Sequence, residues 1–270
     1  MVFKFKSIEY FFDRWWGKAV LLLLFFISPY SKVHFSPQLT QQVVEEVLKN
    51  PIIYTFPIIY ASIKIIFALI VFLLIINRRK FFTLFSLYVS CMFMISALFQ
   101  NMAYTDNYGF VFLIGNFILV FVLAILWVIQ SFSNKENHLK ELVGKNKYWL
   151  IPLSVLAFWF PINSTGKVFN FTLLKLITNE SMTTFCMITP VVLVISLLFC
   201  KRINLFTLTI TSYIGTIFGI TNMIVWFILN PKMWAMGILH LPLIIISLYT
   251  FVICNSKKVA LYCESRELEL

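Results

Sequence analysis

Charge is scarce in this chain. Only 12% of its 270 residues are charged, which is about half the fraction typical of a soluble domain. Apolar residues make up 60% of the sequence, and the mean hydropathy is +0.89. A soluble enzyme, a nucleic-acid-binding domain and a disordered regulator are therefore poor fits. The net charge of +11 comes from basic residues that separate long apolar runs, a pattern typical of a membrane protein.

Acidic residues are absent from the long apolar runs. All eleven Asp and Glu residues fall between or beyond these runs, which disfavours proton or cation coupling by an intramembrane carboxylate and an acid-dependent membrane protease. His34, His138 and His240 fall at different levels of the predicted topology, so a haem held by two histidines is not expected. No histidine and cysteine cluster has metal-ligand spacing, and none of the five cysteines lies on the predicted outer side. The sequence predicts no metal site and no cofactor.

Eight apolar segments are long enough, or nearly so, to be membrane spans. A helical span needs about 20 apolar residues. The first segment has no cleavage site of small residues after it, so we expect a retained anchor and not a signal peptide. The sequence therefore predicts an all-α polytopic membrane bundle of eight helices, with segments Trp16–Tyr30, Ile52–Asn77, Phe81–Asn101, Phe110–Phe132, Tyr148–Ile162, Met182–Cys200, Leu205–Leu229 and Met233–Cys254.

Lysine and arginine residues orient these segments, because cytoplasmic loops carry an excess of both. With the N-terminus inside, 16 of the 22 basic residues fall on the inner side and five on the outer side. The fifth segment is the weak point, since as a helix it reaches only about 22 Å. If it entered and left on one side, the counts would become 14 and seven. The eight-span topology separates the charges better, so both termini are predicted to be cytoplasmic, with the protein in the plasma membrane.

The two halves of the chain share one layout. Residues 1–133 and 134–258 each contain a span, an amphipathic stretch, a span that ends on basic residues, and two further spans. One hypothesis is therefore a parallel internal repeat of four spans within a single domain, 1–270, followed by a cytoplasmic tail, 259–270. The alternative is that any eight-span chain with short loops has this layout. The first amphipathic stretch begins at Ser36 and Pro37, a typical helix start, and is expected to lie on the outer surface.

Polar residues within the spans gather at one predicted depth. Ionisable groups inside a membrane are costly and are functional candidates by default. The sharper hypothesis is an outward-facing polar cavity that accepts an anionic or neutral small molecule. The alternatives are that Lys64 snorkels to the membrane surface and that the amides and the histidine only hold helices together. The candidate ligand-binding residues are Lys64, Asn101, Asn116, Asn222 and His240, with Gln100 at the same level.

The seventh span carries a helix-packing pattern. Thr211, Gly215 and Gly219 share one helix face, and the two glycines form a G-x-x-x-G pattern. Small residues let helix backbones approach closely inside a membrane. This face is expected either at the centre of the bundle or at a contact with a second copy or another membrane protein.

Three function classes remain open. The first is a small-molecule transporter, favoured by the polar layer and the short fifth segment. The second is a non-catalytic assembly, sensor or immunity subunit, favoured by small loops. The third is a lipid-modifying membrane enzyme with His240 as base, which lacks an evident nucleophile, so enzymatic activity is the less favoured reading. A solvated cavity that reaches Lys64 and His240 would favour the first or third class, and a dry bundle the second.

Overall fold

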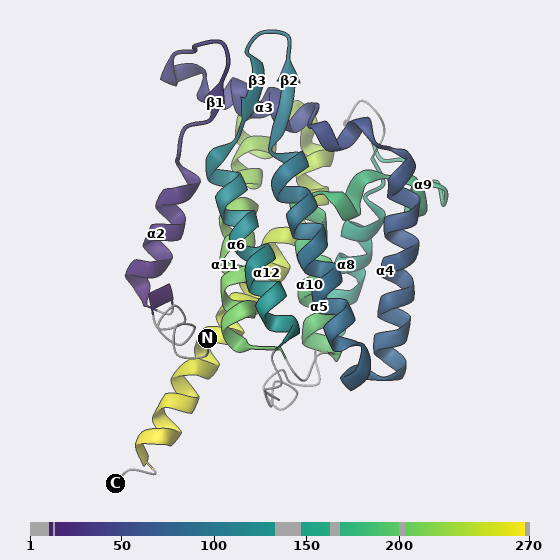
Figure 1. Ribbon diagram of the computed structural model, residues 1–270, viewed down its shortest axis with the longest axis vertical. Coiled ribbons are helices and arrows are strands. Elements are labelled where there is room, and N and C mark those ends of the chain that lie inside the picture. The colour runs from purple at the N-terminus through teal and green to yellow at the C-terminus, as the bar shows by residue number, and fades with distance from the viewer. Residues whose placement is uncertain (1–10, 13, 133–146, 163–167, 200–202, 268–270) are drawn as a thin grey trace.

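The computed structural model describes residues 11–12, 14–132, 147–162, 168–199 and 203–267, with side-chain surroundings up to Ser256. It is a helical bundle with a small sheet at one end (Figure 1). Many of the basic residues used to predict the topology, including most of the loop after the fourth span, lie outside the described residues. The helices are α2 (Trp15–Phe25), α3 (Thr40–Lys49), α4 (Ile58–Ile76), α5 (Arg78–Ile95), α6 (Ile114–Ser131), α8 (Leu150–Trp159), α9 (Lys175–Thr178), α10 (Phe185–Phe199), α11 (Leu205–Met223) and α12 (Trp234–Glu267).

A helix lies in each of the eight predicted segments, but these helices differ in length. Within the described residues, five are long and apolar enough to cross a membrane, and a sixth candidate is a bent pair, Lys175–Thr183 with Phe185–Phe199. α2 and α8 have 11 and 10 residues, and so rise only about 15–17 Å at 1.5 Å per residue. The chain is therefore a membrane protein by composition and helix length, with two helices that end well short of a full crossing.

A three-stranded antiparallel sheet was not expected from the sequence. It has the order β1–β3–β2, with β1 at Tyr30–Ser31, β2 at Met102–Thr105 and β3 at Gly109–Phe112. Gly109 has φ +64 at the end of a three-residue hairpin loop, a position that favours glycine. Strand β1 follows α2 at the end of the predicted first span, and strand β3 precedes α6 at the start of the predicted fourth span. Both helices are therefore shorter than the apolar runs that predicted them.

The amphipathic helix α3 packs on this sheet. Its buried residues Val43 and Val47 form a small apolar cluster with Ala103, Val111 and Leu113. On its polar side, Glu46 accepts a hydrogen bond of 2.7 Å from Asn107, and Glu45 accepts one of 3.0 Å from Asn230. The apolar face that the sequence predicted for a membrane surface thus covers the sheet end of the bundle.

The opposite end of the bundle carries the start of α2 and the distal part of α12 (Figure 1). Lys18 of α2 donates a hydrogen bond of 3.2 Å to Asn255 of α12, and Tyr213 of α11 donates one of 2.9 Å to the Lys18 carbonyl. Both described ends of the chain therefore lie at the same end of the bundle. α12 continues as a helix through Glu267, so most of the predicted tail is helical, and residues 268–270 lie outside the described residues.

Helix α10 is the most enclosed element. Of its 15 residues, all but Cys186 and Phe199 are buried, because its sequence is apolar around its whole circumference. It packs against α8, α11 and α12. At its far end, Lys147 donates a hydrogen bond of 3.1 Å to the Leu197 carbonyl.

Helix α11 uses its glycine face against α12. A Cβ atom on Gly219 would lie 2.9 Å from the Ile244 Cα, and one on Gly215 would lie 2.3 Å from the Ser247 Oγ. Thr211, on the same face, accepts a hydrogen bond of 3.2 Å from the Trp127 indole. The small-residue face is filled by this chain's own helices, so a contact with a second protein through α11 would need a different face.

The close approach of Gly215 and Ser247 predicts that substitutions at these two positions have coupled effects on stability. The Ser247 hydroxyl is buried and has no hydrogen-bond partner among the described residues, so Ser247→Ala should change stability little. Gly215→Ala should destabilise by about 1–3 kcal/mol through overpacking. Adding Ser247→Ala to Gly215→Ala should restore about 1 kcal/mol or more, because it removes the clashing oxygen. Thermal unfolding of the three purified variants measures this coupling, and strictly additive effects would contradict the packing geometry.

Candidate functional site

Lys64 points into the protein, not toward a membrane surface. It lies in the second turn of α4 and is only 2% exposed. Its ammonium donates hydrogen bonds to the Phe158 carbonyl at 2.9 Å, to the Leu176 carbonyl at 3.0 Å and to the Asn179 side-chain oxygen. The Phe158 ring lies 4.8 Å from the Lys64 Nζ, within cation–π range. The snorkelling alternative is therefore wrong for this side chain.

The oxygens around Lys64 come from a break in the chain. α8 ends at Trp159, and the next residue, Phe160, has φ 46 and is the one non-glycine residue with positive φ in the described part of the chain. After the loop that follows, the segment Lys175–Thr183 meets α10 at an angle of 98°. The break leaves carbonyls at the end of α8 without helical partners, and the Lys64 ammonium binds one of them.

Asn179 connects this break to Lys64. Its amide nitrogen donates to the Trp159 and Phe160 carbonyls, and its side-chain oxygen also accepts a bond of 3.2 Å from the Ser181 backbone. The sequence placed Asn179 in the loop between the fifth and sixth spans, and it was not among the predicted site residues. Its half-buried side chain is instead engaged with Lys64 and with the end of α8.

A carboxylate lies nearer to Lys64 than the sequence indicated. Glu180 follows Asn179 and acts electrostatically on Lys64 and on Tyr54. No described carboxylate is within salt-bridge distance of Lys64. The bend before α10 brings Glu180 to this level.

His240 and Asn222 belong to a second polar cluster. Asn222 accepts a hydrogen bond of 2.9 Å from the Trp226 indole and contacts the Cys186 sulfur at 3.5 Å. The Trp226 ring lies 6.0 Å from the His240 ring. His240 is 6% exposed, and its Nδ1 is 2.7 Å from the Met236 carbonyl. No hydroxyl or thiol forms a hydrogen bond with His240 in the described part of the chain.

Phe160 joins the two clusters. Its carbonyl accepts a hydrogen bond from Asn179, and its ring meets the His240 ring edge-to-face at a centroid distance of 6.3 Å. Lys64, through Asn179, and His240 are thus both connected to Phe160, although Lys64 and His240 do not contact each other. Sequence reasoning missed Phe160, Asn179, Glu180, Cys186 and Trp226. The only sequence signals were the short fifth segment and Pro161, which follows Phe160.

The remaining predicted residues lie apart from these clusters. Asn101 is 3% exposed and donates to the Ser96 and Ala97 carbonyls, so it caps the π-helical turn that ends α5. Gln100, in that turn, accepts a bond of 2.8 Å from the backbone nitrogen of Phe185 at the start of α10. Asn116 is half-buried on α6, and its side chain forms no hydrogen bond to the described residues.

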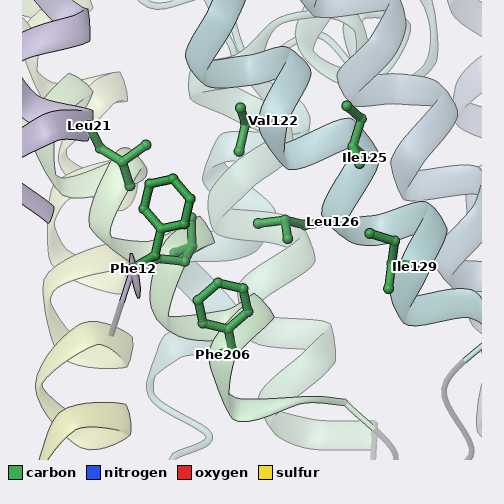
Figure 2. A pocket seen from close by; sticks show the side chains of 8 residues that line it. Phe12, Leu21, Val122, Ile125, Leu126, Ile129 and Phe206 are labelled. Carbon is green, nitrogen blue, oxygen red and sulfur yellow. The ribbon is translucent and has the colours of Figure 1, made fainter. Parts of the chain in front are cut away.

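The two best-defined cavities are apolar and do not include any predicted ligand-binding residue. The larger, about 320 Å³, lies between α4, α8 and α10 and includes Phe158. The smaller, about 190 Å³, lies between α2, α6 and α11 (Figure 2). No group of three metal-ligating side chains occurs in the described residues. Only hydrocarbon side chains line the smaller cavity, namely Phe12, Leu21, Val122, Ile125, Leu126, Ile129, Phe206 and Ile210.

Comparison of the chain with known protein families, with curated proteins and with solved structures finds no match. The functional argument therefore depends on the residues of this chain.

Proposed function

We propose that the protein is a small-molecule transporter with eight membrane segments, and that the layer around Lys64, Phe160 and His240 is its solute site in a closed conformation. The observation that carries this proposal is the buried Lys64 ammonium at a helix break, held by oxygens and not by a carboxylate. Transporters commonly place their sites at discontinuous helices near the middle of the membrane. The two halves, 1–133 and 134–258, and the cytoplasmic placement of both termini in the plasma membrane belong to the same proposal.

A cationic group in this position favours an anionic solute. In the closed conformation the Lys64 ammonium uses the Phe158 and Leu176 carbonyls and Asn179 as acceptors. A carboxylate or phosphate could replace these neutral acceptors and form stronger, charge-assisted hydrogen bonds. Movement of the short segment that carries Asn179 would expose the ammonium without moving α4. Asn222 and the Trp226 indole would add neutral polar groups to the same site.

The test is uptake by proteoliposomes that contain the purified protein. The probes are labelled phosphate, acetate, lactate and glutamate, with glycerol as a neutral solute. We expect at least one anion to enter about tenfold faster than into protein-free liposomes. Lys64→Met should abolish this flux, and Lys49→Met, which changes an exposed lysine of α3, should preserve it. A flux no faster than that of protein-free liposomes for every probe would contradict the proposal.

A second candidate function is a non-catalytic membrane subunit. The observation that favours it is that four of the five candidate residues are hydrogen-bonded within the chain, while the two best-defined cavities are lined mainly by hydrocarbon. In that case Lys64 would stabilise the helix break and carry no solute. The uptake experiment separates the two, since a non-catalytic subunit would give no flux with any probe.

A further inference from the structure

Every N–H donor of the Lys64 ammonium has a hydrogen-bond acceptor. A lysine head group has three N–H donors, and three oxygens accept from it, namely the Phe158 and Leu176 carbonyls and the Asn179 side-chain oxygen. The aromatic face of Phe158 covers the same nitrogen. These three oxygens and the ring form a compact cage around one positive charge.

The cage has the composition of a cation site. The Phe158 carbonyl is at the C-terminal end of α8, where the helix dipole concentrates negative partial charge. The Leu176 carbonyl belongs to the short helix α9, and Asn179 immediately follows that helix. In transporters, carbonyls at the ends of interrupted helices and in unwound segments coordinate sodium ions and protons. Carbonyl oxygens also replace the hydration shell of potassium in channels.

Other groups hold two of the three cage oxygens in place without Lys64. Ser181 donates a hydrogen bond of 2.6 Å to the Phe158 carbonyl, and Asn179 is anchored by bonds to the Trp159 and Phe160 carbonyls. Glu180 adds a negative charge close to the cage. Removing the lysine would therefore leave the Phe158 carbonyl and the Asn179 oxygen in place beside a vacant space, with the Leu176 carbonyl of α9 as the third oxygen.

We propose that this cage is a monovalent-cation site that the chain fills with its own Lys64. When the lysine is shortened, the cage should bind potassium or a small alkylammonium ion. The site also has a consequence for transport, which rests on the proposed function. Because the positive charge of Lys64 is part of the chain, the solute site would attract anions without a bound sodium ion.

The test uses the purified full-length protein and its thermal unfolding midpoint. Lys64→Ala removes three methylene groups and the ammonium, so propylammonium is the matched replacement. We expect the midpoint of Lys64→Ala to rise by several degrees, with saturation, in propylammonium or potassium chloride relative to N-methylglucamine chloride. The wild-type protein should not respond. Lys64→Met is the matched control, because its side chain extends into the cage and leaves no room for a cation.

Three outcomes would overturn the cation site. The first is an equal response of Lys64→Ala and the wild-type protein. The second is an equal response of Lys64→Met and Lys64→Ala, which would indicate a general salt effect. The third is failure of Lys64→Ala to give folded, monodisperse protein in all three salts. Because this measurement involves no flux, it can succeed or fail independently of the transport proposal.

Discussion

Gly219→Leu is expected to eliminate most of the folded protein. A Cβ atom at this position would lie 2.8 Å from the Ile244 Cβ and 2.9 Å from the Ile244 Cα. Because the second of these atoms belongs to the backbone, a change of side-chain rotamer cannot relieve the clash. A leucine would force α11 and α12 apart along their shared interface, at a cost above the 1–3 kcal/mol typical of overpacking.

The yield of monodisperse protein in detergent measures this effect. Ile220→Leu, at the adjacent and 49% exposed position, is the control and should retain a normal yield, since it conserves volume. A Gly219→Leu protein with normal yield and a thermal midpoint near that of the wild-type protein would show that α11 and α12 do not pack as described.

Asn179→Leu is expected to lower the free energy of unfolding by about 2–4 kcal/mol, because it leaves buried hydrogen-bonding groups, one of them charged, without a partner. The substitution removes an acceptor from the Lys64 ammonium and the donor that binds the Trp159 and Phe160 carbonyls. Leucine can replace neither role, so a buried charge and two helix-end carbonyls each lose a partner.

The matched control is Asn170→Leu. Asn170 lies in the same loop, and its side chain accepts only a hydrogen bond of 3.3 Å from the Thr172 backbone in the described structure. That change should cost less than about 1 kcal/mol, as is usual for surface positions. Reversible unfolding of both variants in detergent or mixed micelles gives the comparison. Equal effects of the two substitutions would show that the bonds of Asn179 to Lys64 add nothing to stability.

Together, these two substitutions test different parts of the molecule. The Gly219 substitution tests the close packing of two long apolar helices, which any bundle of this kind needs. The Asn179 substitution tests the break between α8 and α10, where the candidate solute site lies. A protein that tolerates Asn179→Leu but not Gly219→Leu would have a stable bundle with a dispensable polar layer, and the non-catalytic interpretation would then be favoured.

Several features of the site were predictable because single residues identify them. Lys64 and His240 stand out in apolar runs, and ionisable residues in such runs have few ways to avoid burial. Asn101 was selected by the same reasoning, but its side chain closes the helical turn of its own segment. The sequence could not distinguish an asparagine that binds a ligand from one that caps a helix, because both occur as the same residue type at the same predicted depth.

Glu180 shows what a pattern of apolar runs leaves out. The sequence placed it in a loop, and its absence from every span was used to disfavour carboxylate chemistry. The 98° bend between Lys175–Thr183 and α10 returns this segment to the level of Lys64. An apolar pattern indicates the average environment of a segment, but it does not indicate the direction in which the chain re-enters the bundle.

The membrane class, the positions of the eight apolar helices, and Lys64 and His240 as unusual residues were all predictable from the amino-acid sequence. These follow from composition and from the cost of placing charge in hydrocarbon. Three contacts became evident only from the packing of the helices: Lys64 binds the end of α8, Phe160 lies between Asn179 and His240, and the glycine face of α11 meets α12. Those contacts join residues up to 94 positions apart in sequence, and side-chain contacts over such distances depend on how the helices pack, which local periodicity does not specify.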